Sequence, residues 1–261
     1  MTSPPRILSI AGSDSSGGAG IQADIKTICM LGGYAMTAIT AVTAQNTMGV
    51  SAVEVLSPDM VAAQIAACAE DIGLDAVKIG MLGSAEIAGV VADRLEGLAV
   101  PVVFDPVMIA TSGAVLADDA AIAAFERLMA LATLTTPNVA ELAALGGEEA
   151  MARRGIAWLA KGGDAGGDMV EDRLTMPGRD PVVWRSPRIA TRHNHGTGCT
   201  LASAIATLLG KGQALEEAIG GAREFVRAAL AAAPGFGQGH GPMGHHALRP
   251  DWILPGGIQP A

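Results

Sequence analysis

Aromatic, sulfhydryl and basic side chains are all scarce in this chain of 261 residues. Aromatic residues make up 3% of the sequence, so a row of rings that could stack on nucleic-acid bases is not expected. Lysine and arginine together number 17 against 26 aspartate and glutamate residues, which gives a net charge of -9, and no local basic cluster offsets it. This charge balance argues against a nucleic-acid partner.

The three cysteines, Cys29, Cys68 and Cys199, are odd in number and widely spaced, so neither a disulfide framework nor a structural zinc site is expected. This pattern indicates a reducing compartment, and we expect a cytoplasmic protein. The first six residues contain no apolar run, so no signal peptide is expected. The uncharged stretch over residues 27–53 is interrupted by a glycine pair and several threonines, which favours a helix end, a turn and a buried strand over a membrane span. We therefore expect no membrane partner.

Apolar residues make up 50% of the chain and charged residues 16%, a composition that excludes global disorder. The length fits one large α/β domain or two small ones, and because no linker interrupts the pattern we expect a single domain over residues 1–261. Short β-like runs alternate with amphipathic stretches along nearly the whole chain. This alternation predicts an α/β fold, a three-layer α/β/α sandwich with a mainly parallel central sheet.

Local signals place the ends of the expected elements. Ser57 and Ser84 each precede an amphipathic stretch and predict helix starts, because a serine side chain caps the free N–H groups of a first turn. The side chains expected to point inward from the helix after Ser84 are Ile87, Val90, Val91, Leu95 and Leu98. The predicted strands cover residues 6–10, 37–43, 50–56, 76–79, 100–104, 134–136 and 156–160, with a hairpin over 169–185. The other predicted helices cover residues 21–31, 118–131, 140–145, 200–209 and 215–233.

The chemistry is expected beyond the carboxyl ends of the strands, where ligands bind in folds of this class. A turn with four glycines in residues 11–20 follows the first strand and opens a helix, whose first N–H groups favour anions. Its spacing matches neither a P-loop nor a dinucleotide fingerprint, and such a turn is about as often structural as functional. Asp24, one turn into the helix, is either a ligand contact or a favourable charge near the helix start.

Five further polar residues follow predicted strands. Gln45 offers two donors and an acceptor that suit an amino-substituted heterocycle, although a polar strand end meeting solvent explains it equally well. Asp105 suits metal–phosphate chemistry or a helix cap. Asn138 and Glu141 share one side of a helix start, where they fit Mg²⁺ and its waters or a cap with an acidic first turn. Lys161 could place a point charge on a phosphate.

The most specific pattern runs from Asn194 to Thr200, with the sequence Asn-His-Gly-Thr-Gly-Cys-Thr, and leads directly into an alanine-rich helix. Two glycines and small hydroxyl side chains at a helix start build a nest of backbone N–H groups, which can stabilise the charge on a transferring phosphoryl group. Cys199 lies in this positive field, so we expect the pKa of its thiol to be lowered. A purely structural helix start would not need this sequence.

Together these segments resemble the hydroxymethylpyrimidine and phosphomethylpyrimidine kinases of thiamine biosynthesis, members of the ribokinase superfamily. Each segment alone is a weak or moderate signal, but they follow the family's order and span about residues 7–246. The matching segments are residues 11–14, 16–24, 43–47, 78–82, 105–108, 136–138 with Glu141, 161–163 and 195–200. The resemblance implies a ribokinase-like fold and the use of ATP and Mg²⁺ to phosphorylate an aminopyrimidine alcohol and then its monophosphate.

The resemblance also implies roles for particular residues. Those expected around the pyrimidine are Gly12, Asp24, Gln45, Met81 and Val107. Those expected near the nucleotide phosphates are Asp105, Asn138, Glu141 and Lys161, of which Asp105 and Glu141 would hold the metal. The implied anion hole consists of the catalytic residues Gly196, Thr197, Gly198 and Cys199. Related sugar kinases carry an aspartate in place of Cys199, so its role as base or as phosphate-positioning group stays open. A homodimer is expected, formed through strands within residues 37–56.

Two departures from the family's pattern bear on function. Residues 146–156 look trimmed, which puts the wall of the nucleotide site in doubt, and Gln238 stands where some relatives have lysine, which weakens the expected contact with a phosphate in the second step. Two alternatives therefore stay open. One is a pyridoxal or pyridoxine kinase, which shares the fold and, in some members, the Gly-Thr-Gly-Cys loop. The other is a non-catalytic sensor that binds the pyrimidine without turnover.

Overall fold

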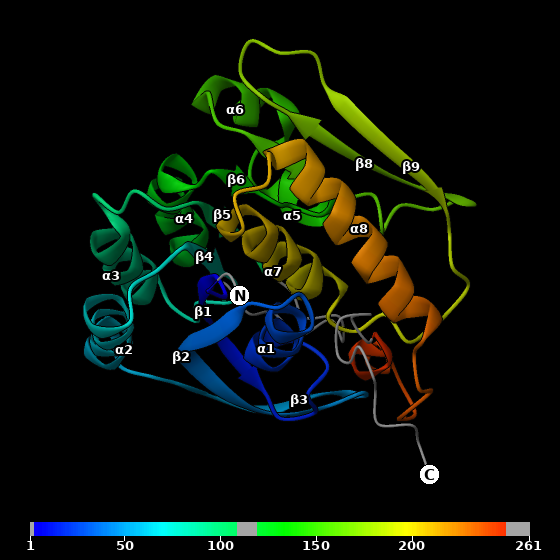
Figure 1. Cartoon of the computed structure of the whole chain (residues 1–261), viewed down its shortest axis with the longest axis horizontal. Helices are drawn as coiled ribbons and strands as arrows, with labels where there is room; N and C mark the ends of the chain where they lie inside the picture. Colours follow the sequence, from blue (N-terminus) through cyan, green and yellow to red (C-terminus); the bar gives the residue numbers. More distant parts are fainter. Residues whose placement is uncertain (1–2, 109–118, 249–261) are drawn as a thin grey trace.

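The computed structural model describes residues 3–108 and 119–248, and within them nine strands form one sheet with helices on both faces (Figure 1). The strands are β1 (Arg6–Asp14), β2 (Tyr34–Asn46), β3 (Gly49–Val55), β4 (Ala76–Ile79), β5 (Val102–Phe104), β6 (Leu134–Thr135), β7 (Trp158–Ala160), β8 (Met169–Thr175) and β9 (Val182–Pro187). The helices are α1 (Gly20–Met30), α2 (Pro58–Asp71), α3 (Ala85–Leu95), α4 (Asp119–Leu131), α5 (Val139–Ala144), α6 (Gly147–Arg154), α7 (Thr197–Gly210) and α8 (Leu215–Ala231), with a short 3₁₀ turn, η1 (His245–Ala247).

The order of the strands creates a crevice near the centre of the sheet. That order is β3-β2-β1-β4-β5-β6-β7-β8-β9, and every pairing from β2 to β7 is parallel. The strands β3, β8 and β9 are antiparallel additions at the two edges. Because β1 has β2 on one side and β4 on the other, the connections run in opposite directions there, and the carboxyl ends of β1 and β4 form the switch point at which such sheets bind ligands. The predicted three-layer sandwich with a mainly parallel sheet is confirmed.

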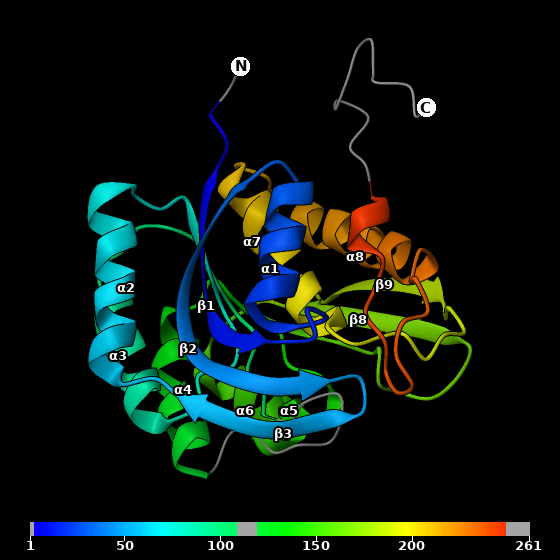
Figure 2. The same cartoon turned by 90° about the horizontal axis from the view of Figure 1, so that it is seen from below.

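Two apolar cores hold the helices against the sheet. In β1, Leu8 and Ile10 pack toward α2, α3 and α4, whereas Ile7 packs toward α7 and α8. Figure 2 shows these two groups of helices on opposite sides of β1 and β2. All three side chains are fully buried, and burying each one stabilises the fold by roughly 1.5–3 kcal/mol. β1 therefore provides a rigid base for the residues that follow it.

Both predicted helix starts are confirmed. The side chain of Ser57 accepts a hydrogen bond from the N–H of Met60, and that of Ser84 accepts one from Ile87. Most side chains expected inward on α3 are buried, but Leu98 lies beyond the helix end and is 38% exposed, so that expectation was wrong. None of the helices within the described ranges combines the length and the hydrophobicity that a bilayer crossing needs.

The first strand is longer than expected. It does not end at Ile10 but continues to Asp14, because residues 11–14 still pair with β2 across a bulge. The glycine-rich turn is correspondingly shorter, and Asp14 stands at the carboxyl end of the strand rather than in a loop. The sequence reading missed this extension because glycine and serine are poor strand formers, and pairing with a neighbour overrides local preference.

Residues 146–156, the segment that looks trimmed in the sequence, have regular structure. They contain the complete helix α6, whose fully buried Met151 belongs to the same apolar core as side chains of α4. Gly146 and Gly155 bracket this helix with φ angles of 92° and 66°, the left-handed conformation that starts and stops it. Burial of Met151 holds this short helix against the core.

Candidate active site

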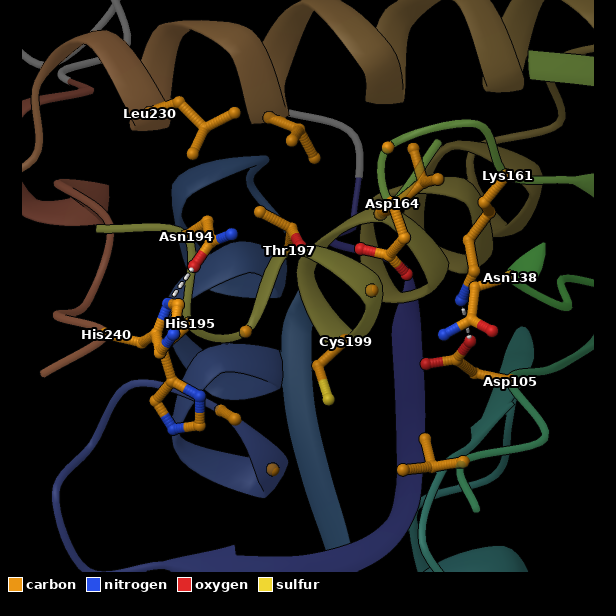
Figure 3. A pocket seen from close by; sticks show the side chains of 18 of the residues that line it. Asp105, Asn138, Lys161, Asp164, Asn194, His195, Thr197, Cys199, Leu230 and His240 are labelled. Carbon is orange, nitrogen blue, oxygen red and sulfur yellow. Dashed lines mark hydrogen bonds and ion pairs between the residues drawn. The ribbon is translucent and has the colours of Figure 1, made fainter. Parts of the chain in front are cut away.

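A cavity of about 730 Å³ lies at the carboxyl ends of β1, β2, β4 and β5, against the first turn of α7 (Figure 3). Its wall includes every site residue expected from the sequence except Asp24, namely Gly12, Gln45, Met81, Asp105, Val107, Asn138, Glu141, Lys161, Gly196, Thr197, Gly198 and Cys199. In Figure 3, Asp105 and Lys161 lie on one side of Cys199, and His195 and His240 lie on the other. The fold thus gathers residues from distant parts of the chain around the switch point of the sheet.

The first turn of α7 is shaped for an anion. Gly196 precedes it with a φ of 87°, and a Cβ there would lie 1.9 Å from the carbonyl oxygen of Gly18, so a larger residue does not fit. A Cβ on Gly198 would lie 3.3 Å from the ammonium nitrogen of Lys161 and 3.4 Å from a carboxylate oxygen of Asp105. Because the N–H groups of a first turn have no acceptor within their helix, this turn offers partial positive charge beside a lysine.

Lys161, Asp105 and Glu141 form what we call the open cluster, since all three line the cavity. The Lys161 ammonium nitrogen lies 2.6 Å from Oδ1 of Asp105 and 3.7 Å from Oε2 of Glu141. Thr136 donates a 3.0 Å hydrogen bond to the same oxygen of Asp105. Burial by itself would lower the pKa of Lys161, but the charges of Asp105 and Glu141 outweigh it and raise that pKa. One permanent cation thus faces two carboxyl groups.

Asn138 and Glu141 form a capping box at the start of α5. Oδ1 of Asn138 accepts a 2.9 Å hydrogen bond from the N–H of Glu141, whose carboxylate accepts one of 2.7 Å from the N–H of Asn138. The helix cap that the sequence left as an alternative is therefore present, and both residues also reach the cavity wall. Burial raises the pKa of Glu141 to about 7, a shift that Lys161 opposes and Asp105 reinforces.

The open cluster fits a magnesium ion bound together with phosphates. In the part of the chain that the structure describes, no group of three or more His, Cys, Asp or Glu side chains forms a metal site by itself. Mg²⁺ usually takes only one or two protein carboxylates and completes its octahedron with water and phosphate oxygens. Asp105 and Glu141 match that donor set, and the raised pKa of Glu141 identifies a carboxyl group that a nearby cation would help to ionise.

Asp24 lies away from the cavity wall, so the expectation that it contacts a bound ring is not met. It is fully buried, with Oδ2 2.8 Å from the ammonium nitrogen of Lys78, which is also fully buried. Ser9 donates to Oδ2 at 2.5 Å and Ser203 donates to Oδ1 at 2.6 Å. We call Lys78 and Asp24 the closed pair. The presence of Lys78 in an otherwise apolar strand could have predicted this pairing, because a buried charge requires a partner of opposite charge.

The expectation for the thiol of Cys199 was also wrong. The thiol accepts a hydrogen bond from the backbone N–H of Gly20, yet the pKa of Cys199 rises to about 11. Burial is the main cause; Lys78 opposes it, and the negative charges of Asp24 and Asp105 add to it. The positive end of the helix would lower the pKa of the thiol, but the cost of desolvating the thiolate is larger. The sequence did not reveal that this thiol is buried. Cys199 therefore keeps its proton at neutral pH.

Asp14 and His195 form a buried pair that the sequence reading did not single out. Nε2 of His195 lies 2.8 Å from Oδ2 of Asp14, and both side chains line the cavity. Burial would raise the pKa of Asp14, but hydrogen bonds from His195, Ser16 and Ala19 outweigh it and lower the pKa to about 2. An aspartate at a strand end before small residues is a signal for such a turn. Its partner, 181 residues away, could not be inferred.

The far wall of the cavity is held by two arginines. Arg188 donates to the carbonyl oxygens of Gly163 at 2.6 Å and Gly167 at 2.7 Å, and also to that of Ala165. These bonds give the loop after β7 a defined path beside the open cluster. Arg223 on α8 forms a buried 2.6 Å ion pair with Asp172 of β8, whose other oxygen accepts from the N–H of Gly162 at 2.9 Å. Sequence reasoning missed these residues because their partners come from separate elements.

Known proteins show the same combination of sequence and fold. Residues 14–244 match the phosphomethylpyrimidine kinase family. The hydroxymethylpyrimidine/phosphomethylpyrimidine kinase of Rhizobium meliloti is 48% identical over 255 residues, which cover 91% of this chain and 96% of the relative. The phosphomethylpyrimidine kinase structure from Clostridium difficile has a TM-score of 0.73 at 38% identity, covering 87% of this chain and 99% of that one.

A pyridoxal kinase has a similar structure. The pyridoxal kinase from Staphylococcus aureus in complex with AMP-PCP and pyridoxal has a TM-score of 0.83 at 31% identity, covering 94% of this chain and 95% of that one. The expected ribokinase-like fold is thus confirmed. The pyridoxal kinase and the phosphomethylpyrimidine kinase with this fold are both kinases. With a family match that spans most of its length, this chain belongs to the phosphomethylpyrimidine kinase family and is a kinase.

Proposed function

We propose that this kinase transfers the γ-phosphoryl group of ATP to the hydroxymethyl group of 4-amino-5-hydroxymethyl-2-methylpyrimidine and then to the resulting monophosphate, in thiamine biosynthesis. The observation that carries the proposal is the approach of Gly198 to Lys161 and Asp105 in a cavity that also holds Gln45. An anion-binding helix turn, a lysine and two carboxyl groups suit phosphoryl transfer. The amide of Gln45 suits an amino-substituted ring in the same space.

Each part of the cavity wall then has a task. The N–H groups at Gly198 and Cys199 stabilise negative charge on the group in transfer, and Lys161 adds a full positive charge beside it. Asp105 and Glu141 would hold Mg²⁺, which neutralises charge on the phosphate oxygens when bound. Gly12 and Met81 narrow the cavity where the ring would lie, since a Cβ on Gly12 would come 2.3 Å from Cε of Met81. Positioning and charge stabilisation carry most of the rate in such reactions.

Cys199 has two candidate roles. A thiol that keeps its proton at neutral pH is a poor base, which favours a role in positioning the phosphate. A role as base would require bound ligands to lower its pKa. Phosphoryl transfer passes through a loose transition state that needs little help from a base, so either role is compatible with catalysis.

The pyridoxal kinase alternative has one observation in its favour, the close structural similarity to the Staphylococcus aureus enzyme. The sensor alternative rests on the trimmed segment at residues 146–156, and it predicts thermal stabilisation by the pyrimidine without release of ADP. Measuring kcat/KM for the aminopyrimidine alcohol, its monophosphate and pyridoxal under identical conditions tests the proposal. We expect both pyrimidines to exceed pyridoxal, and the reverse order would contradict the assignment.

We also propose a cytoplasmic homodimer built on β2 and β3. The supporting observation is that apolar side chains are exposed on both faces of this edge ribbon, Val53 at 44% and Val55 at 42% on one face and Val42 at 47% on the other, with Met48 at 64% in the turn between the strands. Side chains of this kind are often covered by a partner. Replacing Val53 and Val55 with lysine should give a monomer in sedimentation experiments, and an unchanged mass would place the interface elsewhere.

A further inference from the structure

His245 is a buried histidine behind the cavity. It is 2% exposed, does not line the cavity, and begins the short turn η1, which packs against α1. Nε2 of its imidazole lies 2.9 Å from Oγ1 of Thr200, a fully buried residue in the first turn of α7. Thr200 directly follows residues 196–199, which we call the anion-binding turn. A side chain from the last described residues thus contacts the helix turn that is proposed to bind the phosphoryl group.

The partners of the imidazole show which atom donates in this contact. Burial is the main cause that lowers the pKa of His245 to about 4, and the charge of Lys26 adds to it, so the ring is neutral at neutral pH. A hydrogen bond with the backbone of Met243 opposes this shift, as a carbonyl oxygen does when an imidazole N–H donates to it. A neutral imidazole carries one hydrogen, and because Nε2 faces Thr200, this hydrogen lies on Nδ1. Nε2 is therefore an acceptor, and the hydroxyl of Thr200 donates to it.

Two other buried helix threonines choose a different partner. The hydroxyl of Thr207, also on α7, donates to the carbonyl oxygen of Ser203 at 2.7 Å. The hydroxyl of Thr27 on α1 donates to the carbonyl oxygen of Ala23 at 2.7 Å. Both bonds reach the carbonyl four residues earlier, which is the local acceptor open to a threonine in a helix, and bonds of this kind often bend the helix. Thr200 differs because His245 offers its hydroxyl another acceptor.

The carbonyl that Thr200 would otherwise use belongs to Gly196, the first residue of the anion-binding turn. This carbonyl accepts the backbone N–H of Thr200 at 2.9 Å. The conformation of Gly196 has little freedom, because its φ is 87° and a Cβ on it would lie 1.9 Å from the carbonyl oxygen of Gly18. A second bond from the threonine hydroxyl would pull on this carbonyl and tilt the peptide groups whose N–H groups bind the anion.

The segment that carries His245 also holds the chain on the other side of the turn. The N–H of His195 donates to the carbonyl oxygen of Gly241 at 3.1 Å. The N–H of Gly244 donates to the carbonyl oxygen of Ala229 on α8 at 2.9 Å, which fixes the segment to a neighbouring helix. The segment therefore contacts the chain immediately before and immediately after the anion-binding turn.

We propose that His245 is a positioning residue for phosphoryl transfer. By accepting the hydroxyl hydrogen of Thr200, it keeps that hydroxyl away from the carbonyl of Gly196 and holds the N–H groups of the anion-binding turn in the orientation that receives the phosphoryl group. It acts through Thr200 rather than on the substrate. The inference rests on the proposed role of residues 196–199 as the anion site. It implies that loss of the acceptor is harmful only while the hydroxyl is present.

Steady-state kinetics test this implication. His245→Phe keeps a ring but removes the acceptor, so the Thr200 hydroxyl turns to Gly196. We expect kcat to fall by about tenfold or more with little change in KM for the alcohol, because a shifted turn affects the transition state most. Adding Thr200→Val, which keeps the shape of threonine without its hydroxyl, should restore kcat to within about threefold of the original enzyme.

Two control variants accompany the test. His245→Gln is the matched control, because its amide oxygen can accept the same hydrogen, and it should retain most of kcat. Thr207→Val removes a buried hydroxyl that bonds within the same helix, and it should leave kcat within about twofold of the original value. All variants are compared on the alcohol that the original enzyme phosphorylates best, so a wrong substrate assignment leaves this test valid.

A purely structural role for His245 predicts other results. It would lower the melting temperature but leave kcat nearly unchanged, or give a loss of kcat that Thr200→Val does not relieve, and either result would overturn the inference. Should His245→Phe not fold, nitrogen NMR of the imidazole in the original enzyme tests the same contact, and a hydrogen found on Nε2 would overturn it. Full activity in Gly198→Asp would instead refute the proposed anion site, and with it the role of His245.

Discussion

The closed pair and the open cluster contain the same chemical groups but differ in their surroundings. In the closed pair, Lys78 and Asp24 have no exposed surface, and serine hydroxyl groups bind both oxygens of Asp24. In the open cluster, the side chain of Lys161 is 11% exposed and lies between two carboxyl groups at a cavity wall. The closed pair has one carboxylate for one ammonium group. The open cluster has two carboxyl groups for one ammonium group, so a bound ligand can change which of these groups pair.

The comparison separates stability from function. A buried charge loses most of its hydration and becomes costly as soon as its partner is removed. A charge beside a cavity can exchange its partner for water, a proton or a ligand. We therefore expect damage to the closed pair to appear in unfolding experiments and damage to the open cluster to appear in kinetics.

The largest effect is expected for Gly198→Asp, which places a third carboxylate where the open cluster meets α7. The new side chain would begin 3.3 Å from the Lys161 nitrogen and would repel an incoming phosphoryl group. We expect kcat/KM to fall by about 10³-fold or more with little change in the melting temperature. Gly198→Ala is the control for added bulk and should lose much less. Normal activity in the aspartate variant would show that the anion site lies elsewhere.

Lys78→Met should destabilise the protein by about 3–5 kcal/mol, because it leaves Asp24 buried without its partner. Denaturant unfolding measures the loss. The double variant Lys78→Met with Asp24→Asn removes both charges and should recover much of the stability. Lys161→Met is the matched substitution in the open cluster and should cost far less stability while reducing turnover. Equal losses of stability for the two lysines would remove the distinction between the clusters.

The pKa of Glu141 predicts a smaller, pH-dependent effect on stability. The folded protein raises this pKa from 4.5 to about 7, so it binds the proton more tightly than the unfolded chain does. The resulting stabilisation is complete below about pH 4.5 and is lost as the pH rises through about 7, by an amount on the order of 1–3 kcal/mol. Unfolding of Glu141→Gln should show a flatter pH profile over this range. A profile that matches the original protein would assign the dependence to another group.

Cys199→Ala is expected to have the smallest effect, a reduction of kcat by about tenfold with KM nearly unchanged, because the thiol contributes less than the backbone groups beside it. Single-turnover kinetics separate the chemical step from product release. A loss confined to KM would make Cys199 a binding residue. A loss of kcat in Cys199→Ser as large as that in Cys199→Ala would point instead to a base, because a serine hydroxyl ionises far less readily than a thiol.

Local patterns predicted most of the fold. The serine caps at Ser57 and Ser84 depend on atoms within a few residues, and both are present as expected. The limits of local reading are visible at Leu98, which was expected on the inward side of α3 but lies beyond the helix end and is 38% exposed. They are also visible at β1, whose last residues are strand because β2 lies beside them.

The candidate site divides in the same way. Residue type and position after a strand were enough to predict several members of the site, and the structure gathers them around one cavity. These members are Gln45, Asp105, Lys161 and residues 196–199. The burial of Asp24 and the raised pKa of Cys199 were not expected, because the cost of desolvation decides both. Burial depends on which elements pack together and leaves no local trace in the sequence.

By itself, the amino-acid sequence determined the alternation of strands and helices, the parallel sheet and the order of the glycine-rich and polar segments, because these depend on local propensity and periodicity. The tertiary structure alone decided that Asp24 pairs with Lys78, that Cys199 retains its proton and that His195 meets both Asp14 and Gln45. These outcomes depend on desolvation and on contacts between residues as many as 181 positions apart, and such long-range terms exist only once the chain is folded.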